Sequence, residues 1–239
     1  MLALAFLVSY PTVSFSHYDR AIAVFDFGSQ YSQLIVRRIR ELGYQALLHQ
    51  PNQIGQIGNP SAIILSGGPR STAEPDAPDI DFQRLMAYGV PVLGICYGMQ
   101  LLNLKCGGRI HPGTTREYGP ALLRPVVSDG LMAGVTDSQV WMSHSDTCER
   151  PASARVLAEN QDGVPVALQW DDRTFGIQFH PEVSHSEQGG RMLANFLAMA
   201  KDPAPFEIGA FKDRLVAETR EIVAGRPVVC GVSGGVDST

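Results

Sequence analysis

The stretch "LGICYGMQLL", residues 93–102, joins an apolar run typical of a buried strand to an apolar run typical of a helix. Cys96 lies between the two runs, with Gly94 and Gly98 on either side of it. Glycines relieve the crowding of a tight strand-to-helix turn. In open α/β sheets such turns lie at the carboxyl ends of the strands, where ligands bind. The stretch therefore predicts an α/β fold with a thiol at its functional edge.

Strands and helices alternate before this stretch. The apolar runs at 21–28, 44–49, 61–69 and 90–95 predict strands, and the segments at 30–43 and 81–89 predict helices. In the first of these segments Tyr31, Ile35 and Ile39 fall on one helical face. The alternation favours an open, mostly parallel sheet flanked by helices on both faces.

From about Arg109 the pattern changes, because strand follows strand. Short β-rich runs at 121–127, 138–144, 154–160, 164–170 and 174–180 predict a mixed or antiparallel extension of the sheet. A helix is expected within 187–200. The fold class is therefore α/β, with a β extension.

The predicted domain organisation has four parts. Residues 1–20 form an N-terminal extension, 21–203 the main domain, 204–227 a linker helix, and 228–239 a strand with a loop. The extension is apolar, but it has no Lys or Arg before Arg20 and so lacks the positive region of a signal peptide. Its apolar stretch is also too short to span a bilayer.

Charge and cysteine content limit the function classes. Nineteen Lys and Arg stand against 24 Asp and Glu, a net charge of -5, without a basic block. This argues against nucleic acid or an anionic membrane as a partner and favours a small polar substrate. The four cysteines are too few for a disulfide framework in a chain of 239 residues, which favours a reducing, cytoplasmic location.

Cys96 is a candidate nucleophile. A free cysteine in an apolar context is most often a small buried hydrophobe. A residue on a tight turn, however, is held out over the sheet edge, and a helix N-terminus favours the thiolate. A nucleophile needs a base and the base needs an orienting group. "FGIQFHPE" (175–182) supplies both, since His180 ends an apolar strand and Glu182 follows after a proline that fixes the backbone.

"LSGGP" (65–69) ends another apolar strand. An attacked carbonyl becomes an oxyanion, which requires N–H donors that are fixed in advance. The glycines of this loop let its amides approach a substrate closely. A turn without a further role is the alternative.

"GGP", "GICYGMQ" and "FHPE", in this order, resemble the class I (triad) glutamine amidotransferases, and the resemblance covers about residues 21–200. It implies hydrolysis of glutamine to supply ammonia, with no cofactor and no metal in the glutaminase domain. The site residues that it implies are the triad Cys96, His180 and Glu182, the oxyanion-hole N–H groups of Gly68 and Tyr97, and the glutamine-binding residue Gln100.

Three further segments, at 26–43, 116–121 and 140–146, are similar to one branch of this family. Complete enzymes of that branch use ATP to aminate xanthosine monophosphate to GMP. The similarity implies that Ser143 and His144 help to form the glutamine pocket. The branch usually has glycine where this chain has Ser145, and at positive φ a serine would cost about 1 kcal/mol.

"SGGVDST" (233–239) resembles the phosphate loop of ATP pyrophosphatases. A strand followed by serines and glycines offers N–H groups that can hold an anion. No lysine follows the glycines, so this is not the G-x-x-x-x-G-K-[ST] loop. The loop is expected to be incomplete, because the sequence stops before the following helix. Its residues are Ser233, Gly234, Gly235, Val236, Asp237 and Ser238.

The predicted function is therefore a glutaminase domain. By resemblance, glutamine is its substrate, and ATP with magnesium and xanthosine monophosphate belong to a complete, homodimeric enzyme. Two alternatives stay open. One is the amidotransferase subunit of another biosynthetic pathway, against which the 233–239 loop counts. The other is a catalytically silent regulatory or docking module, against which the intact triad counts.

Overall fold

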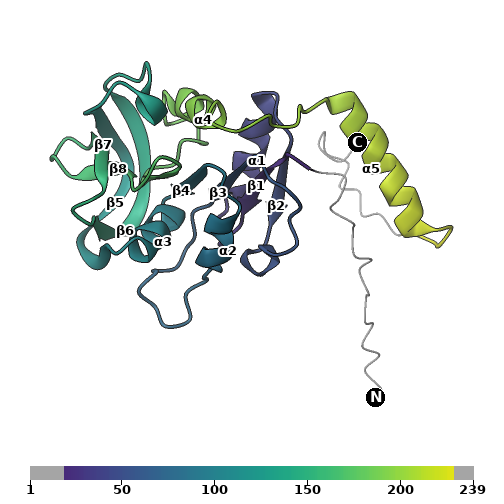
Figure 1. The fold of residues 1–239 in the computed structure, drawn as a ribbon, viewed down its shortest axis with the longest axis horizontal. Coiled ribbons are helices and arrows are strands. Elements are labelled where there is room, and N and C mark those ends of the chain that lie inside the picture. Colours follow the sequence, from purple (N-terminus) through teal and green to yellow (C-terminus); the bar gives the residue numbers. More distant parts are fainter. Residues whose placement is uncertain (1–18, 229–239) are drawn as a thin grey trace. The chain divides into compact units, whose positions relative to one another are not determined.

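The computed structural model describes residues 19–228 (Figure 1). Residues up to Phe206 belong to one compact unit, and residues from Glu207 onward belong to another, so each unit is described by itself. The predicted phosphate loop at 233–238 lies outside the described residues, and so does most of the predicted N-terminal extension.

A nine-stranded sheet forms the centre of the first unit, in the order β2-β1-β3-β4-β9-β8-β7-β5-β6. Five neighbouring strands are parallel: β2 (Ala46–His49), β1 (Ile22–Phe25), β3 (Ala62–Leu65), β4 (Val92–Ile95) and β9 (Thr174–Ile177). The other four pair antiparallel: β8 (Pro165–Gln169), β7 (Arg155–Glu159), β5 (Arg109–Pro125) and β6 (Ser138–Glu149). The mostly parallel sheet with an antiparallel extension is the predicted fold class.

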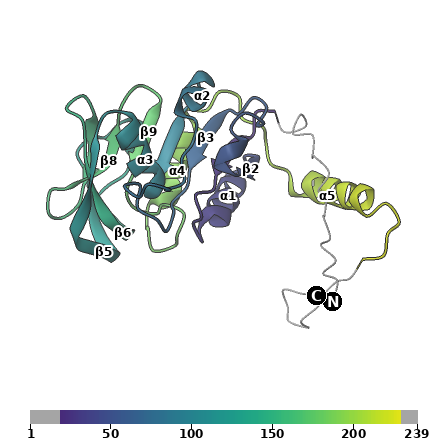
Figure 2. The same cartoon turned by 90° about the horizontal axis from the view of Figure 1, so that it is seen from below.

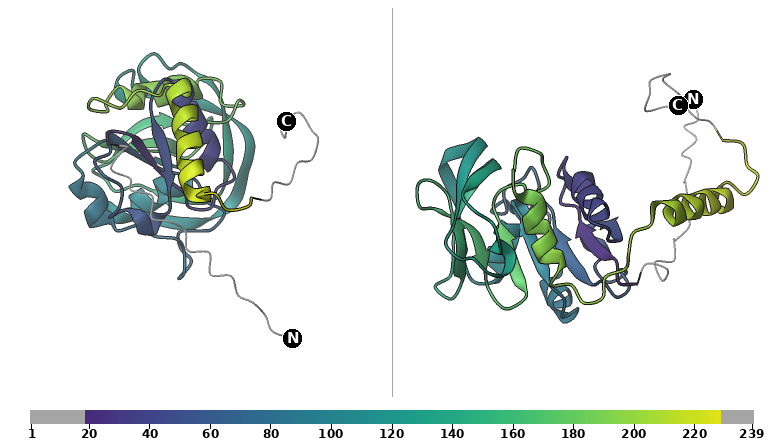
Figure 3. Two further views of the ribbon diagram at one scale, coloured as in Figure 1. Left: turned by 90° about the vertical axis from the view of Figure 1, so that its right-hand side faces the viewer. Right: turned by 90° about the horizontal axis from the view of Figure 1, so that it is seen from above.

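Helices cover both faces of the parallel half. α1 (Ser32–Glu41) and α4 (Gly189–Leu197) contribute to one buried cluster, whereas α2 (Phe82–Ala87) and α3 (Tyr97–Lys105) contribute to the other. Short 3₁₀ turns occur at Pro51–Gln53 and Gly130–Met132. Both α1 and α4 lie toward the viewer in the right-hand view of Figure 3.

The two faces follow from the alternation of side chains along each strand. In β1, Ile22 and Val24 join the cluster under α1 and α4, whereas Ala23 and Phe25 join the cluster under α2 and α3. Such strands are buried on both sides, which explains their unbroken apolar sequence.

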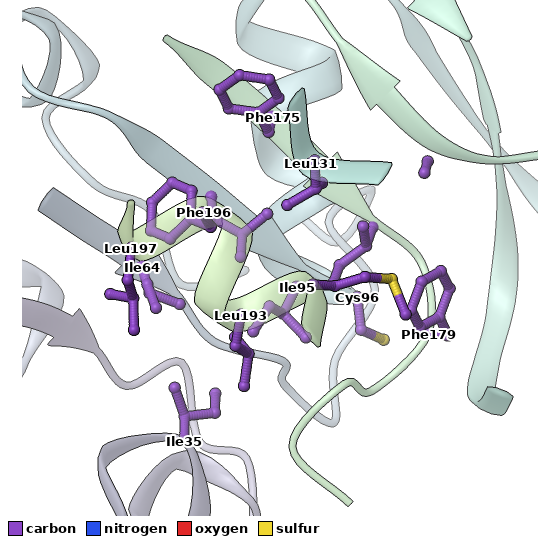
Figure 4. Packing of buried hydrophobic residues seen from close by; sticks show 14 of the residues in the cluster. Ile35, Ile64, Ile95, Cys96, Leu131, Phe175, Phe179, Leu193, Phe196 and Leu197 are labelled. Atoms are coloured by element: carbon purple, nitrogen blue, oxygen red, sulfur yellow. The ribbon is translucent and has the colours of Figure 1, made fainter. Parts of the chain in front are cut away.

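Figure 4 shows the first cluster at close range. Leu193 and Phe196 of α4 lie over Ile64 and Ile95 of the sheet, and all four side chains are fully buried. Cys96 directly follows Ile95 and belongs to the same cluster. The thiol is thus attached to the buried core, where close packing restricts its position.

One strand differs from its prediction. β5 begins at Arg109, not at residue 121, and runs for 17 residues. It pairs with β6 from Arg109 to Leu123, with a register shift between Pro112 and Glu117 (Figure 2). The prolines and glycines within 112–120 disfavour a central strand. They are tolerated because the two strands pair as a ribbon at the end of the sheet.

α5 (Ile208–Val223) lies in the second unit. The helix ends at Ala224, which has left-handed backbone angles and is followed by Gly225. Such an ending is common for helices. Among the described helices, none is long and apolar enough to cross a membrane.

Candidate active site

Cys96 occupies the turn between β4 and α3 with φ 50° and ψ −104°. A residue other than glycine in such a region costs on the order of 1–3 kcal/mol, and it persists only where its surroundings hold it. Here the Cys96 N–H donates to Ile177 O at 2.8 Å, and the Cys96 carbonyl accepts from the Gln100 N–H at 3.1 Å. Strand β9 and helix α3 therefore hold the strained turn from both sides.

The two glycines near Cys96 allow close backbone packing. A Cβ at Gly94 would lie 2.5 Å from the backbone of Gly98, and a Cβ at Gly98 would lie 2.4 Å from the carbonyl oxygen of Leu65. Neither position can hold a larger residue without backbone movement. The glycines thus seat the first turn of α3 directly on β3 and β4.

His180 and Glu182 form a buried pair. His180 Nδ1 lies 2.7 Å from Glu182 Oε1, and the two residues are 3% and 0% exposed. Because a carboxylate can only accept, Nδ1 carries the proton in this bond. The His180 side chain is also hydrogen-bonded to Cys96. The three side chains that the sequence predicted as a triad are therefore in contact in the order thiol, imidazole, carboxylate.

Opposing effects act on the pKa of His180. Burial lowers it, but the hydrogen bonds to Cys96 and Glu182 and the charges of both groups raise it to about 10. The imidazolium form is therefore favoured at neutral pH. An imidazolium beside a thiol is prepared to deliver a proton to a leaving group.

The backbone around this pair is fixed by a strand, a helix and a loop residue. The His180 N–H donates to Trp141 O on β6 at 3.0 Å, and the Ser186 hydroxyl donates to His180 O. From α1, Arg38 Nε donates to Glu182 O at 2.9 Å. These bonds determine the direction in which the imidazole and the carboxylate point.

The predicted oxyanion loop packs against the same group. A Cβ at Gly67 would lie 3.0 Å from His180 Cε1, and a Cβ at Gly68 would lie 2.8 Å from Phe27 O. Among the hydrogen bonds of the described residues, the N–H groups of Gly68 and Tyr97 have no protein acceptor. Both donors are therefore available to a substrate oxygen.

The predicted glutamine-pocket residues also come together. Cys96 Sγ lies 3.5 Å from Ser143 O, and Gln100 Nε2 lies 3.5 Å from Asp146 O. His144 Nδ1 lies 3.0 Å from the same Asp146 oxygen. Residues 143–146 of β6, the pocket wall, thus lie beside both the thiol and Gln100.

The pocket wall accommodates Ser145 without the strain considered for it. Ser145 is not among the described residues that adopt positive φ. A serine is therefore tolerated here, since only a left-handed backbone would favour glycine.

The family profile described as "Glutamine amidotransferase class-I" matches residues 23–200. The chain belongs to this family. The matched range contains β1 to β9, except for the first residue of β1, and α1 to α4, and hence every residue of the candidate site that the structure describes.

Curated relatives of this amidotransferase are about twice its length. The glutamine-hydrolyzing GMP synthase of Nitratidesulfovibrio vulgaris (strain DP4) is 45% identical over 229 residues, which are 91% of this chain and 44% of that protein. The glutamine-hydrolyzing GMP synthase of Cytophaga hutchinsonii gives the same figures: 45% identity, 91% of this chain and 44% of that protein. The chain therefore spans less than half the length of these relatives.

Solved structures share the amidotransferase fold. A candidate GMP synthase subunit from Thermoplasma acidophilum has a TM-score of 0.65 and 24% identity, covering 84% of this chain and 99% of its own. A glutamine amidotransferase from Thermotoga maritima has a TM-score of 0.55 and 19% identity, covering 86% and 90%. At these identities the likeness concerns the fold.

Sequence reasoning misses two residues that lie at the candidate site. Helical periodicity places Tyr31 on the core-facing side of α1, but its ring lies edge-on to His180, with 5.1 Å between ring centroids. Asp146 is only 8% exposed, and its carboxylate accepts from the Ser71 hydroxyl. Both residues lie in segments that resemble one branch of the family, Tyr31 within 26–43 and Asp146 at the end of 140–146, but neither segment assigned them a role.

Within residues 19–228, no group of three or more His, Cys, Asp or Glu side chains is placed to hold a metal ion. The predicted ATP phosphate loop falls outside this range.

Proposed function

We propose that this amidotransferase hydrolyses glutamine through Cys96, His180 and Glu182, and that the ammonia serves the amination of xanthosine monophosphate to GMP in a longer protein. The observation that carries the proposal is the strained Cys96, at φ 50°, hydrogen-bonded to a histidine that a buried carboxylate orients. Backbone strain of this kind is found mainly at functional sites, where the surrounding structure holds it.

In the first half-reaction, the Cys96 sulfur attacks the side-chain amide carbon of glutamine. A C–S bond forms, the carbonyl oxygen becomes an oxyanion, and the N–H groups of Gly68 and Tyr97 donate hydrogen bonds to it. The C–N bond then breaks as His180 gives its proton to the departing nitrogen. The products are ammonia and a γ-glutamyl thioester on Cys96.

In the second half-reaction, His180 is neutral and takes a proton from water. The water oxygen attacks the thioester carbon, the C–S bond breaks, and glutamate leaves. The thiolate and the imidazolium are restored together. Glu182 holds the His180 Nδ1 proton throughout and balances the ring's charge, as the orienting acid does in related triads.

The pocket wall fits the rest of the substrate. Glutamine carries an ammonium group, and Asp146, whose main-chain carbonyl accepts from Gln100, also supplies a buried carboxylate. A buried charge is stable only when it is paired, and the Ser71 hydroxyl alone does not neutralise it. We therefore assign Asp146 to the substrate ammonium, with Gln100, Ser143 and His144 around it.

The use of the ammonia is inferred from the relatives. Proteins named glutamine-hydrolyzing GMP synthase match 91% of this chain, which spans 44% of their length. Four further properties are predictions for the longer protein. They are binding of ATP and magnesium at residues 233–238, binding of xanthosine monophosphate, homodimer formation and a cytoplasmic setting. The names of these relatives do not favour the amidotransferase of another pathway.

The test is release of glutamate and ammonia from glutamine. We expect slow hydrolysis by the chain and none by Cys96→Ala. Cys106→Ser is the matched control, since Cys106 ends the same helix that Cys96 begins, and it should retain the parental rate. A thiol-reactive glutamine analogue should label Cys96 alone.

Hydrolysis by Cys96→Ala at the parental rate would remove Cys96 as the nucleophile. A chain that neither hydrolyses glutamine nor reacts with the analogue would instead be a silent docking module.

A further inference from the structure

A second histidine–carboxylate pair lies beside the triad. His144 on β6 is the register partner of Glu117 on β5, and His144 Nε2 lies 3.4 Å from Glu117 Oε2. The His144 side chain is 9% exposed and that of Glu117 is 33% exposed. The pair is therefore largely withdrawn from water, so its protonation affects the structure around it.

The two ring nitrogens of His144 both face acceptors. Nδ1 lies 3.0 Å from the carbonyl oxygen of Asp146, and Nε2 faces the carboxylate of Glu117. A neutral imidazole has one N–H, so either tautomer leaves a lone pair directed at an acceptor. Only the imidazolium can donate to both partners.

Several groups affect the pKa of His144. The titratable groups near His144 are Glu117 from β5, His180 after β9, and Cys96, whose Sγ approaches Ser143 O. Asp146, on the same strand, contacts the ring through its main-chain carbonyl. Burial is the largest influence and lowers the pKa of His144, and the charge of His180 lowers it further. The charge of Glu117 and the bond to Asp146 O oppose this, without restoring the ordinary value.

We propose that Glu117 is a positioning residue that stabilises a proton on His144 and thereby fixes the pocket wall, residues 143–146. The wall matters because Asp146 O accepts from both His144 and Gln100, while Ser143 O accepts from Cys96. A His144 ring that turns away from Glu117 also releases Asp146 O. The proposal rests on the proposed glutaminase activity, for which the wall binds substrate.

The expected consequence concerns substrate binding. Protonation completes both hydrogen bonds of His144, so KM for glutamine should fall as pH falls through the pKa of this residue. The chemical step should change little, because Cys96, His180 and Glu182 keep their contacts with one another. A change in KM with constant kcat is the signature of lost binding that is shared by ground state and transition state.

Kinetics with three variants test this. Glu117→Ala should raise KM about tenfold while kcat stays within about twofold, the pattern for lost ground-state binding. In Glu117→Gln the new amide can donate to Nε2 of a neutral His144 ring, so KM should return toward the parent's value. KM of this variant should also no longer depend on pH between about pH 5 and pH 8. Glu149→Gln is the matched control, because Glu149 pairs with His111 across the same two strands, but both side chains are over half exposed.

A titration of the His144 ring by nuclear magnetic resonance gives a readout that needs no activity. The pKa of His144 should be lower in Glu117→Gln than in the parent, and equal to the parent's in Glu149→Gln. Glu117→Gln is isosteric, so the comparison holds even if Glu117→Ala does not fold.

An unchanged pKa of His144 in Glu117→Gln, or a fall in kcat at constant KM in Glu117→Ala, would overturn the inference. Absence of glutaminase activity in the parent would reject the proposed function instead, and the titration would still decide whether Glu117 holds the proton.

Discussion

Cys96 combines a strained backbone with a reactive side chain. Its φ of 50° lies in a region that only glycine adopts without strain, and its thiol is buried against His180. The strain arises from the Cβ that carries the thiol, and its cost should be measurable when that Cβ is removed.

Cys96→Gly should be more stable than Cys96→Ala by about 1 kcal/mol, because glycine relieves the positive φ and alanine does not. Both variants should lack glutaminase activity. Urea unfolding of the two variants measures the difference. Equal midpoints would show that the turn is not strained.

His180 and Glu182 should differ in importance. His180 carries the proton, whereas Glu182 orients it, and a neutral amide can still accept from Nδ1. We expect His180→Ala to lower kcat by about 10³-fold or more and Glu182→Gln by about 10- to 100-fold. Steady-state kinetics with glutamine rank the two, and the reverse order would exchange the roles.

At the scale of elements, the site depends on how closely α3 approaches β3. The approach is set by Gly98, whose missing side chain leaves room for the Leu65 carbonyl. The first turn of α3 carries Tyr97 and Gln100, so a shift of this helix moves the oxyanion donor and the pocket together. The packing of α3 on β3 and the position of the site residues therefore both depend on Gly98.

Gly98→Ala should destabilise the protein by about 2 kcal/mol or more and reduce glutaminase activity, because its Cβ would clash with backbone. Gly190→Ala in α4 is the control, since a Cβ there meets nothing within 4 Å. It should be neutral or stabilising by up to about 1 kcal/mol. Thermal unfolding and activity of both variants test this, and equal stabilities would contradict the close approach.

At the scale of the whole molecule, the buried triad links stability to pH. The pKa of His180 is about 10 in the folded protein, against 6.5 for an ordinary histidine. A raised pKa means that the folded state binds the proton more tightly than the unfolded state. This contribution is fully present below about pH 6.5 and is lost as pH rises through about 10.

The free energy of unfolding should therefore fall between about pH 7 and pH 10. Cys96→Ala removes a hydrogen bond that raises the pKa of His180, so its stability should depend less on pH in this range. Urea unfolding at several pH values, with Cys106→Ser as the control, makes the comparison. Parallel curves for the parent and Cys96→Ala would show that the thiol does not support the imidazolium.

Local sequence was sufficient for the parallel half of the sheet and for the turn at Cys96. Each of these strands is buried on both faces and reads as a continuous apolar run, and Gly94 and Gly98 mark the tight turn between β4 and α3. The resemblance of three short motifs then indicated the family, which the matched profile over residues 23–200 shows. These features depend on neighbours within a few residues.

Tertiary structure alone decided which distant residues meet. His180 reaches Cys96 because β9 pairs with β4, and no local pattern states that pairing. The start of β5 at Arg109, the contact of Tyr31 with His180 and the pairing of Glu117 with His144 depend likewise on the packing of remote segments. The physical reason is that periodicity records which face of an element is buried, whereas the partner on that face is chosen by the packing of the whole chain.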